Sequence, residues 1–328
     1  MKRAPLYATV VTAACLLLAF CAAGEARDGE DRDGDSTSGA AAALFGDAGY
    51  DAAAAPRTDT GRLPAPQRVR PPRAKSYYSF AGEEVPVSDF DVLDRLNREL
   101  VTNTFYHSST QWILKYKSRY FPVIEQILRE EGVPEDLKYI AVAESAFRDF
   151  KSPAGAAGVW HFMPATAREY GLEVNGEVDK RYHLEESTRA AAKFLRHLHD
   201  KLGSWTLAAA AYNRGLGGIR SRKESQKADD FWDMFLNEET SRYVLRIVAL
   251  KDIIEDPTYY GFYLEPEDYM APITDYATVT VTESIPDLPA FAEQYGVSYR
   301  RLKVLNPWLV DTELTVSSGN SYEVRIAR

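Results

Sequence analysis

The sequence predicts a mainly α-helical protein with a small α+β module at its C-terminal end. Apolar residues recur every three or four positions through residues 80–262, which is the period of an amphipathic helix. No convincing alternating run of apolar and polar residues interrupts that segment, and a β-rich stretch appears only later, at residues 276–281. The apolar content of 45% and the charged content of 27% are ordinary for a globular protein with a packed core.

Helical segments can be placed from this periodicity and from residues that favour helix ends. The expected helices, in order, are Phe90 to Leu100, Trp112 to Tyr120, 120–131 stopped by Gly132, Ser187 (as N-cap) to Leu202, Trp205 to Asn213 after Ser204, and Ser241 to Glu255. Residues 276–281 and 321–326 are expected strands, and two short helices centred near Phe291 and Leu302 lie between them.

Residues 1–21 have the pattern of an export signal. A positively charged start precedes an apolar stretch, Tyr7 to Phe20, that is too short to span a membrane permanently. Two interpretations of its end remain open. Cys21 closes a stretch that resembles the lipobox, in which the cysteine becomes lipidated, whereas ordinary cleavage near residues 22–24 would release a soluble protein. Both interpretations predict an exported, periplasmic protein.

Three parts are expected after the signal. Residues 22–76 are rich in Gly, Ala, Asp and Pro, and such a segment buries too little apolar surface to offset its ordering entropy, so we expect a disordered tether. The helical domain is expected at 77–270 and the C-terminal module at 271–328.

Composition excludes several classes of function. The net charge of −9 argues against nucleic-acid binding. Both cysteines, Cys15 and Cys21, lie in the signal segment, so the mature part contains no disulfide and no thiolate metal site. The histidines are scattered and form no HExxH motif. We therefore expect no metal centre.

One carboxylate falls on the buried side of an otherwise apolar helix. In the segment that starts at Pro134, the apolar stripe is Leu137, Ile140 and Ala141, and the next position on that face is Glu144. Burial disfavours the ionised form, and a carboxyl that keeps its proton near neutral pH can protonate a glycosidic oxygen. Taken alone, this segment is more typical of a glutamate that pairs with a buried Arg or Lys, or that lies at the water-facing edge of the stripe.

Further motifs follow Glu144-Ser145 in a fixed order. They are Gly155 to Pro164 (GAAGVWHFMP), Asp179-x-Arg181, Ala211 to Gly215 (AYNRG) and Glu239 to Tyr243 (ETSRY). Over residues 90–265 this set resembles the lysozyme-like lytic transglycosylases, most closely the membrane-bound lytic murein transglycosylase D type. The resemblance implies a lysozyme-like catalytic domain that acts on peptidoglycan.

By this resemblance Glu144 is the catalytic acid/base. Substrate binding is implied for Ser145, His161, Phe162, Met163, Tyr212, Asn213 and Tyr243. Tyr212 and Tyr243 are expected near Glu144, with Asn213 supporting the loop, although sequence alone would place both tyrosines in the core. Trp160 is expected in the core, and Phe162 and Met163 at the cleft.

The chain departs from the family pattern at His161, where the family usually has glutamine. Glutamine offers a donor and an acceptor without charge, whereas histidine can become cationic near neutral pH. A cationic His161 beside Glu144 would favour the ionised carboxylate and weaken it as an acid.

The motifs supply a single clear carboxylate, whereas ordinary glycosidases use two. The resemblance implies that Glu144 protonates the oxygen between N-acetylmuramic acid and N-acetylglucosamine and that the muramyl N-acetyl group stabilises the cation. It further implies that Glu144 then deprotonates the 6-hydroxyl to close a 1,6-anhydro ring, and that the reaction needs no cofactor. Two alternatives remain: a hydrolase like goose-type lysozyme, and a non-catalytic peptidoglycan-binding protein.

The C-terminal module resembles a degenerate LysM domain, which is a glycan-binding fold. Residues 295–298 and Leu305 to Pro307 match its pattern, but the usual Gly-Asp-Thr-Leu stretch after the first strand is replaced by Ser284 to Leu288. Glycan binding and a packing role on the catalytic domain both remain open.

Overall fold

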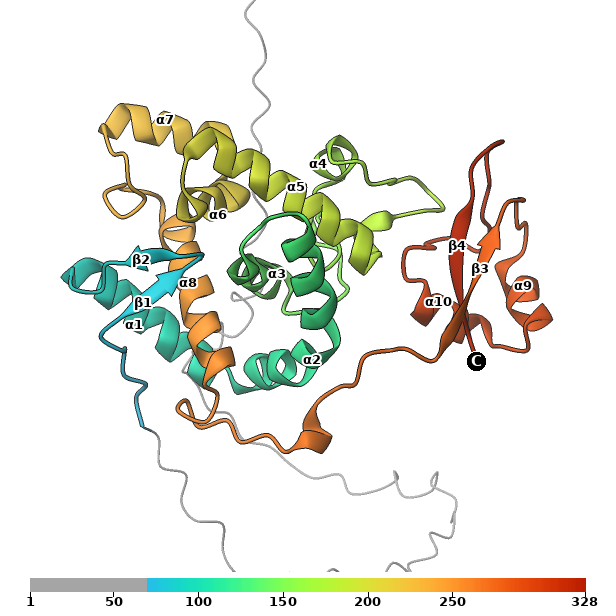
Figure 1. Cartoon of the computed structure of the whole chain (residues 1–328), viewed down its shortest axis with the longest axis horizontal. Helices are drawn as coiled ribbons and strands as arrows, with labels where there is room; N and C mark the ends of the chain where they lie inside the picture. The colour runs from blue at the N-terminus through green and yellow to red at the C-terminus, as the bar shows by residue number, and fades with distance from the viewer. Residues whose placement is uncertain (1–69) are drawn as a thin grey trace, which may run out of the picture. The chain divides into compact units, whose positions relative to one another are not determined.

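A computed structural model describes residues 70–328 of the chain (Figure 1). The expected export signal with Cys21, and most of the expected tether, lie outside these residues. Within the described part, helices dominate from Phe90 to Glu255, and a two-stranded sheet with two short helices follows near the C-terminal end. The predicted mainly α fold with a small strand-containing module is therefore confirmed. No helix in residues 70–328 combines the length and apolarity needed to cross a membrane.

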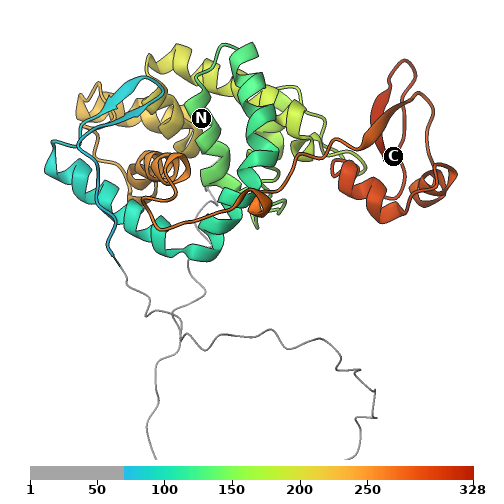
Figure 2. The same cartoon turned by 60° about the horizontal axis from the view of Figure 1, so that its bottom comes forward.

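The helical domain contains the following helices: α1 (Phe90–Phe105), α2 (His107–Glu130), α3 (Lys138–Ser145), α4 (Pro164–Glu169), α5 (Leu184–Leu202), α6 (Trp205–Arg214), α7 (Leu216–Gln226) and α8 (Glu238–Glu255). Short 3-10 turns precede α3 at Glu135–Leu137 (η1) and α5 at Lys180–Tyr182 (η2), and a third lies at Pro266–Asp268 (η3). α8 contacts α1, α3 and α6, and both views show it beside α1 (Figure 1 and Figure 2). The core of the domain forms around α8.

The bounds of α2 and α5 differ from the sequence expectation. α2 is one helix where two were expected, because the apolar face on Ile113 and Leu114 continues without a break to Ile124. α5 begins before Ser187, and its N-cap is His183, whose Nδ1 accepts from the Glu186 N–H at 3.4 Å. The Ser187 hydroxyl instead donates to the Leu184 carbonyl inside the first turn, a local bond that competes with capping.

The sequence did not predict the hairpin that begins the described fold. β1 (Tyr78–Phe80) pairs antiparallel with β2 (Glu83–Val85), and strands of three residues are too short to show a period. Ordered packing also starts earlier than the tether boundary at residue 76, because the Lys75 ammonium lies 2.5 Å from Asp252 Oδ1.

This hairpin is tied to the start of α6 through Glu83. Its carboxylate accepts from the N–H groups of Trp205 (2.6 Å) and Thr206 (2.9 Å) and from the Ser204 hydroxyl (2.8 Å). Burial alone would raise the pKa of Glu83, but the hydrogen bonds from Thr206, Trp205 and Ser204 outweigh it and hold the pKa below its ordinary value. Ser204 is the N-cap of α6, as predicted. The hairpin thus anchors the helix that carries Tyr212.

The C-terminal module has the predicted order of strand, helix, helix, strand. These elements are β3 (Tyr276–Val281), α9 (Leu288–Gln294), α10 (Tyr299–Leu305) and β4 (Tyr322–Ala327). The strands pair antiparallel, from Tyr276 opposite Ala327 to Val281 opposite Tyr322. The module has its own small apolar core, which includes Leu288, Leu302 and Trp308.

We expect Glu83→Ala to lower the free energy of unfolding by about 1–3 kcal/mol, because three donors at the start of α6 lose a charged acceptor. Glu84→Ala, on the exposed neighbour in β2, should change it by no more than about 0.5 kcal/mol. Urea unfolding followed by circular dichroism measures both.

The stabilisation by Glu83 also depends on pH. Since the fold lowers the pKa of Glu83, its contribution to the free energy of unfolding is present at neutral pH and is lost as the pH falls below the ordinary value of 4.5. If the stability difference between the wild type and Glu83→Ala stayed the same in strong acid, the Glu83 carboxylate would not be the stabilising group.

Candidate active site

Glu144 lies in the last turn of α3 with its carboxyl facing the protein interior. Leu137, Ile140 and Ala141, which precede it on the same face, are fully buried. Only 8% of the Glu144 side chain is exposed. The helix then ends because Ala146 and Phe147 both adopt left-handed backbone conformations. The apolar stripe therefore does carry a carboxylate to the buried side, as the sequence predicted.

The partners of this carboxylate come from two other elements. The Tyr243 hydroxyl, on α8, donates to Glu144 Oε1 at 2.6 Å. His161, on the loop before α4, places Nδ1 at 3.5 Å from Glu144 Oε2. Within residues 70–328, no Lys or Arg forms an ion pair with Glu144. The more ordinary expectation, a carboxylate neutralised by a buried basic side chain, is therefore not what the structure shows.

Both tyrosines near Glu144 stay protonated. Burial, followed by the charge of Glu144, raises the pKa of Tyr243 and of Tyr212 well above the ordinary value. Tyr243 can therefore act only as a donor to the carboxylate. The Tyr212 hydroxyl donates to the Trp160 carbonyl at 2.7 Å, so Tyr212 supports the loop that carries His161.

That loop is a tight turn closed by one arginine. The Arg181 Nη1 donates to the carbonyls of Gly155 (2.6 Å) and Phe162 (2.9 Å). Gly158 has φ +76°, and a Cβ there would lie 1.9 Å from the Arg181 carbonyl oxygen. His161 also has a left-handed backbone, and its N–H donates to the Gly158 carbonyl. The turn directs the imidazole toward Glu144.

His161 is the most unusual side chain of the site. It is only 6% exposed, and its ring packs against Phe150 at 5.2 Å. Its Nε2 is buried and has no hydrogen-bond partner in the described part of the chain, residues 70–328. A buried imidazole nitrogen without a partner costs free energy unless a ligand satisfies it. This nitrogen is therefore a candidate contact for a bound substrate.

The aromatic and methionine side chains predicted on the same loop lie in different surroundings. Trp160 lies in the core, as predicted, and donates through Nε1 to Thr188. Phe162 also lies in the core with 3% exposure, so its expected position at the cleft surface is wrong. It packs near Phe194 and Tyr212, which provide the apolar contacts its ring requires. Met163 is 37% exposed, which leaves its side chain accessible.

Ser145 and Asn213 make internal hydrogen bonds. The Ser145 hydroxyl donates to the Ala141 carbonyl and accepts from the Phe147 N–H, both at 3.1 Å, and so stabilises the end of α3. The Asn213 amide donates to Glu239 at 3.4 Å and accepts from the Thr240 hydroxyl at 3.2 Å. Asn213 thus joins α6 to the start of α8, and neither of its bonds involves Glu144.

Sequence reasoning missed Asp149. Its side chain is exposed to solvent, but desolvation by the surrounding protein raises the pKa of its carboxyl. The next residue, Phe150, packs against His161, so Asp149 lies in the segment beside the site. Asp149 could have been found in the sequence because it follows Glu144 by only five residues. Residues 70–328 contain no cluster of His, Cys, Asp and Glu suited to a metal ion.

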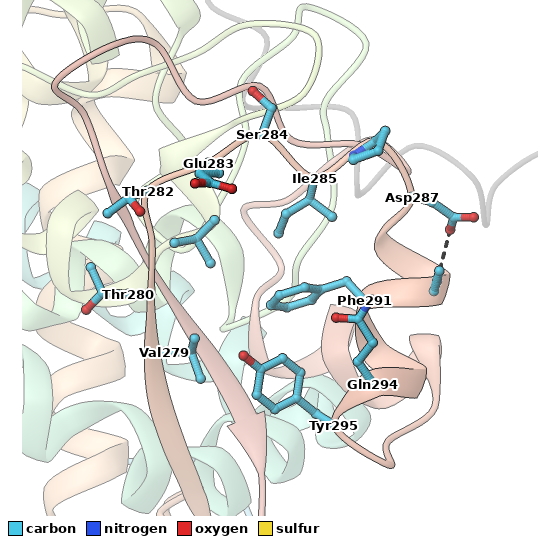
Figure 3. A pocket seen from close by; sticks show the side chains of 13 residues that line it. Val279, Thr280, Thr282, Glu283, Ser284, Ile285, Asp287, Phe291, Gln294 and Tyr295 are labelled. Carbon is cyan, nitrogen blue, oxygen red and sulfur yellow. Dashed lines mark hydrogen bonds between the residues drawn. The ribbon is translucent and has the colours of Figure 1, made fainter.

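A second candidate site lies in the C-terminal module. A cavity of about 400 Å³ opens between β3, the Thr282–Asp287 loop and α9. Figure 3 shows the rings of Phe291, on α9, and of Tyr295, directly after it, directed toward Val279 on the strand. Their centroids are 5.0 Å apart. One wall is formed by residues 284–287, which belong to the stretch that departs from the LysM pattern.

Two family models match the chain. Residues 121–235 match the transglycosylase SLT domain, and residues 277–328 match the soluble lytic transglycosylase C-terminal LysM-like domain. Both matches agree with the resemblance that the motifs indicated.

The chain is also similar to individual known proteins. It is 29% identical over 255 residues to membrane-bound lytic murein transglycosylase D of Escherichia coli, a match that covers 75% of this chain and 54% of that protein. The chain therefore spans about half the length of that relative. It is 33% identical over 145 residues to a peptidoglycan transglycosylase of Escherichia phage T7, covering 43% of this chain and 11% of that protein. Among solved structures, an inactive mutant of the lytic transglycosylase Slt from Pseudomonas aeruginosa aligns over 47% of this chain and 26% of that chain, with 22% identity and a TM-score of 0.36.

We expect Gly158→Ala to destabilise the protein by more than about 3 kcal/mol. The added Cβ would collide with the Arg181 backbone, and residue 158 would also have to keep its left-handed conformation with a side chain. Gly155→Ala is the matched control: its φ is +94°, but no atom of residues 70–328 lies within 4 Å of the added Cβ. It should cost only the backbone strain of about 1–2 kcal/mol. Urea unfolding measures both, and equal losses would contradict the close approach of the loop to Arg181.

Proposed function

Because the chain carries a transglycosylase SLT domain followed by a LysM-like domain, we propose that it is a peptidoglycan lytic transglycosylase. The observation that carries the proposal is the buried carboxyl of Glu144. It ends an apolar helix face, accepts a hydrogen bond from Tyr243 and faces His161 on the Gly155–Pro164 loop. A buried carboxyl that pairs with no Lys or Arg in residues 70–328 is suited to deliver a proton to a glycosidic oxygen.

The proposed reaction uses Glu144 twice. Its proton passes to the oxygen between N-acetylmuramic acid and N-acetylglucosamine, and the bond from that oxygen to the muramyl C1 breaks. The muramyl N-acetyl carbonyl stabilises the cationic centre. The Glu144 carboxylate then takes the proton of the muramyl 6-hydroxyl while O6 bonds to C1, which leaves a 1,6-anhydro ring and regenerates the acid. The cycle consumes no water and needs no cofactor.

Tyr243 has a positioning role in this cycle. Its hydroxyl holds Oε1 of Glu144 at 2.6 Å, and its raised pKa keeps it a donor while the carboxylate is charged. Within residues 70–328, Oε2 has only the longer contact of 3.5 Å to His161. We therefore assign Oε2 as the oxygen that exchanges protons with the sugar.

Asp149 supports hydrolysis as a second candidate function. Hydrolases that act on glycans use a second carboxylate to activate water or to form a covalent intermediate. Asp149 is accessible and lies in the segment beside His161. The two reactions give different products, because hydrolysis leaves reducing ends and transglycosylation leaves anhydromuramyl ends.

The proposal places the protein in the periplasm. Residues 1–21 would direct export, and Cys21 would anchor the protein if it is lipidated. The E. coli relative is described as membrane-bound, which supports an anchored form. The substrate is the glycan strand of peptidoglycan, which the LysM-like module would also bind through the cavity that Phe291 and Tyr295 line.

We expect Glu144→Gln to lower the release of anhydromuramyl products from purified peptidoglycan by about 10²- to 10⁴-fold, because the amide cannot donate or accept the reacting proton. Glu169→Gln, on an exposed glutamate of α4, is the matched control and should digest like the wild type. Mass spectrometry of the products measures the effect. Reducing-end products from the wild type would establish the hydrolase instead, and no products from a folded wild type would contradict both reactions.

We expect His161→Ala to lower the release of products from purified peptidoglycan by about tenfold more than His161→Gln does. Glutamine keeps a donor and an acceptor in the place of the imidazole, 3.5 Å from Glu144 Oε2, whereas alanine keeps neither. His197→Ala, on an exposed histidine of α5, should digest like the wild type. Equal losses for the two His161 variants would show that the site needs no hydrogen-bonding side chain at this position.

A further inference from the structure

The LysM-like module is attached to the helical domain through backbone hydrogen bonds. The Asp179 N–H donates to the Trp308 carbonyl and the Val310 N–H donates to the Glu177 carbonyl, both at 2.8 Å. Val178, between them, forms an isolated β-bridge with Leu309. The Val178 side chain is buried in the apolar core of the module. A loop of the helical domain therefore completes the fold of the module.

Side chains extend this attachment. The Glu177 carboxylate accepts from the Thr315 N–H at 2.6 Å and from its hydroxyl at 3.1 Å. The Lys180 ammonium lies 3.8 Å from the centre of the Trp308 ring, and Lys180 is only 7% exposed. A cation–π contact is stronger when it is withdrawn from water in this way. Further contacts join the Tyr322 hydroxyl to Glu173 and Arg325 to Glu185.

The segment that leads into the module is also held. The Met270 N–H donates to the Lys115 carbonyl, and the Ser118 hydroxyl donates to the Met270 carbonyl, both at 2.8 Å. The Arg119 Nε donates to the Ala271 carbonyl at 3.0 Å. These bonds fix the connection to α2. The module is thus attached at its connection and at its α10–β4 loop.

One residue joins this interface to the active-site loop. The Asp179 N–H bonds to the module, while its carboxylate accepts from Arg181 Nε at 2.8 Å and from Nη2 at 2.6 Å. The same guanidinium donates through Nη1 to the carbonyls of Gly155 and Phe162. Both Asp179 and Arg181 are buried. The path from Trp308 to the ends of the His161 turn therefore consists of direct hydrogen bonds through two buried side chains.

We propose that the LysM-like module positions the active-site loop, with Asp179 and Arg181 as the positioning residues. Docking of the module holds Asp179, Asp179 orients the Arg181 guanidinium, and the guanidinium closes the Gly155–Phe162 turn that directs His161 toward Glu144. The turn needs such support because His161 has a left-handed backbone, which a residue with a side chain adopts at a cost. The module therefore controls the turnover rate of the enzyme, and it does so whether or not it also binds glycan. This inference rests on the proposed function.

The double variant Glu177→Ala, Lys180→Ala tests the proposal in the full chain. It removes two interface side chains, neither of which bonds to the Gly155–Phe162 turn. The matched control is Glu293→Ala, Arg300→Ala, which removes one acid and one base from the exposed surface of the module. Steady-state kinetics use a soluble tetrasaccharide of alternating N-acetylglucosamine and N-acetylmuramic acid. We expect kcat of the interface variant to fall by about 10- to 100-fold, with KM within about twofold of the control.

Two other kinetic outcomes would overturn the proposal. An unchanged kcat in a folded interface variant would show that the module does not position the loop. A raised KM with unchanged kcat would show that it acts by binding glycan. If the interface variant fails to fold by circular dichroism, Tyr322→Phe, Arg325→Ala changes the opposite side of the interface and should lower kcat in the same way.

A second measurement does not depend on activity. Hydrogen exchange of the backbone amides in residues 155–162 reports closure of the turn, which includes the Ala157–Phe162 bridge. We expect exchange there to accelerate in the interface variant and not in its control. Unchanged exchange would overturn the inference even if the wild type cleaves peptidoglycan. Faster exchange with no cleavage by the wild type would leave the coupling intact and contradict the proposed function.

Discussion

A buried carboxyl group on α3 needs hydrogen-bond partners, and the packing of the other elements of this structure supplies them. Glu144 lies at the end of a helix face that is otherwise fully apolar, and a buried polar group is costly unless hydrogen bonds satisfy it. Its partners come from distant parts of the chain: Tyr243 from α8, and His161 from the loop before α4. The site therefore exists only when α3, α8 and this loop are packed together.

Buried polar groups elsewhere hold those elements in place. Arg181 joins both ends of the His161 turn to Asp179, and Glu83 holds the start of α6, which carries Tyr212. Such groups direct the packing more specifically than apolar contacts do, because an unpaired partner would be left buried. A reaction that needs a proton donor within hydrogen-bond reach of the substrate depends on this precision.

The sequence predicted the features that depend on local pattern. Periodicity located Glu144 on the buried side of α3, and the order of strands and helices in the C-terminal module was correct. Features that depend on tertiary contacts were missed or wrong. The strands of the Tyr78–Val85 hairpin are too short to show a period, and Phe162 lies in the core because its neighbours are aromatic rings from α5 and α6. No local pattern could show that Val178 would complete the core of the module.

The most direct test of Glu144 as the single acid/base is a crystal structure of the Glu144→Gln variant with a bound peptidoglycan oligosaccharide. We expect the glycosidic oxygen to lie within hydrogen-bond distance of the residue 144 side chain and Tyr243 still to contact that side chain. We also expect the muramyl N-acetyl carbonyl to approach C1. A glycosidic oxygen far from residue 144, or the Asp149 carboxylate at the opposite face of the muramyl ring, would contradict this role of Glu144.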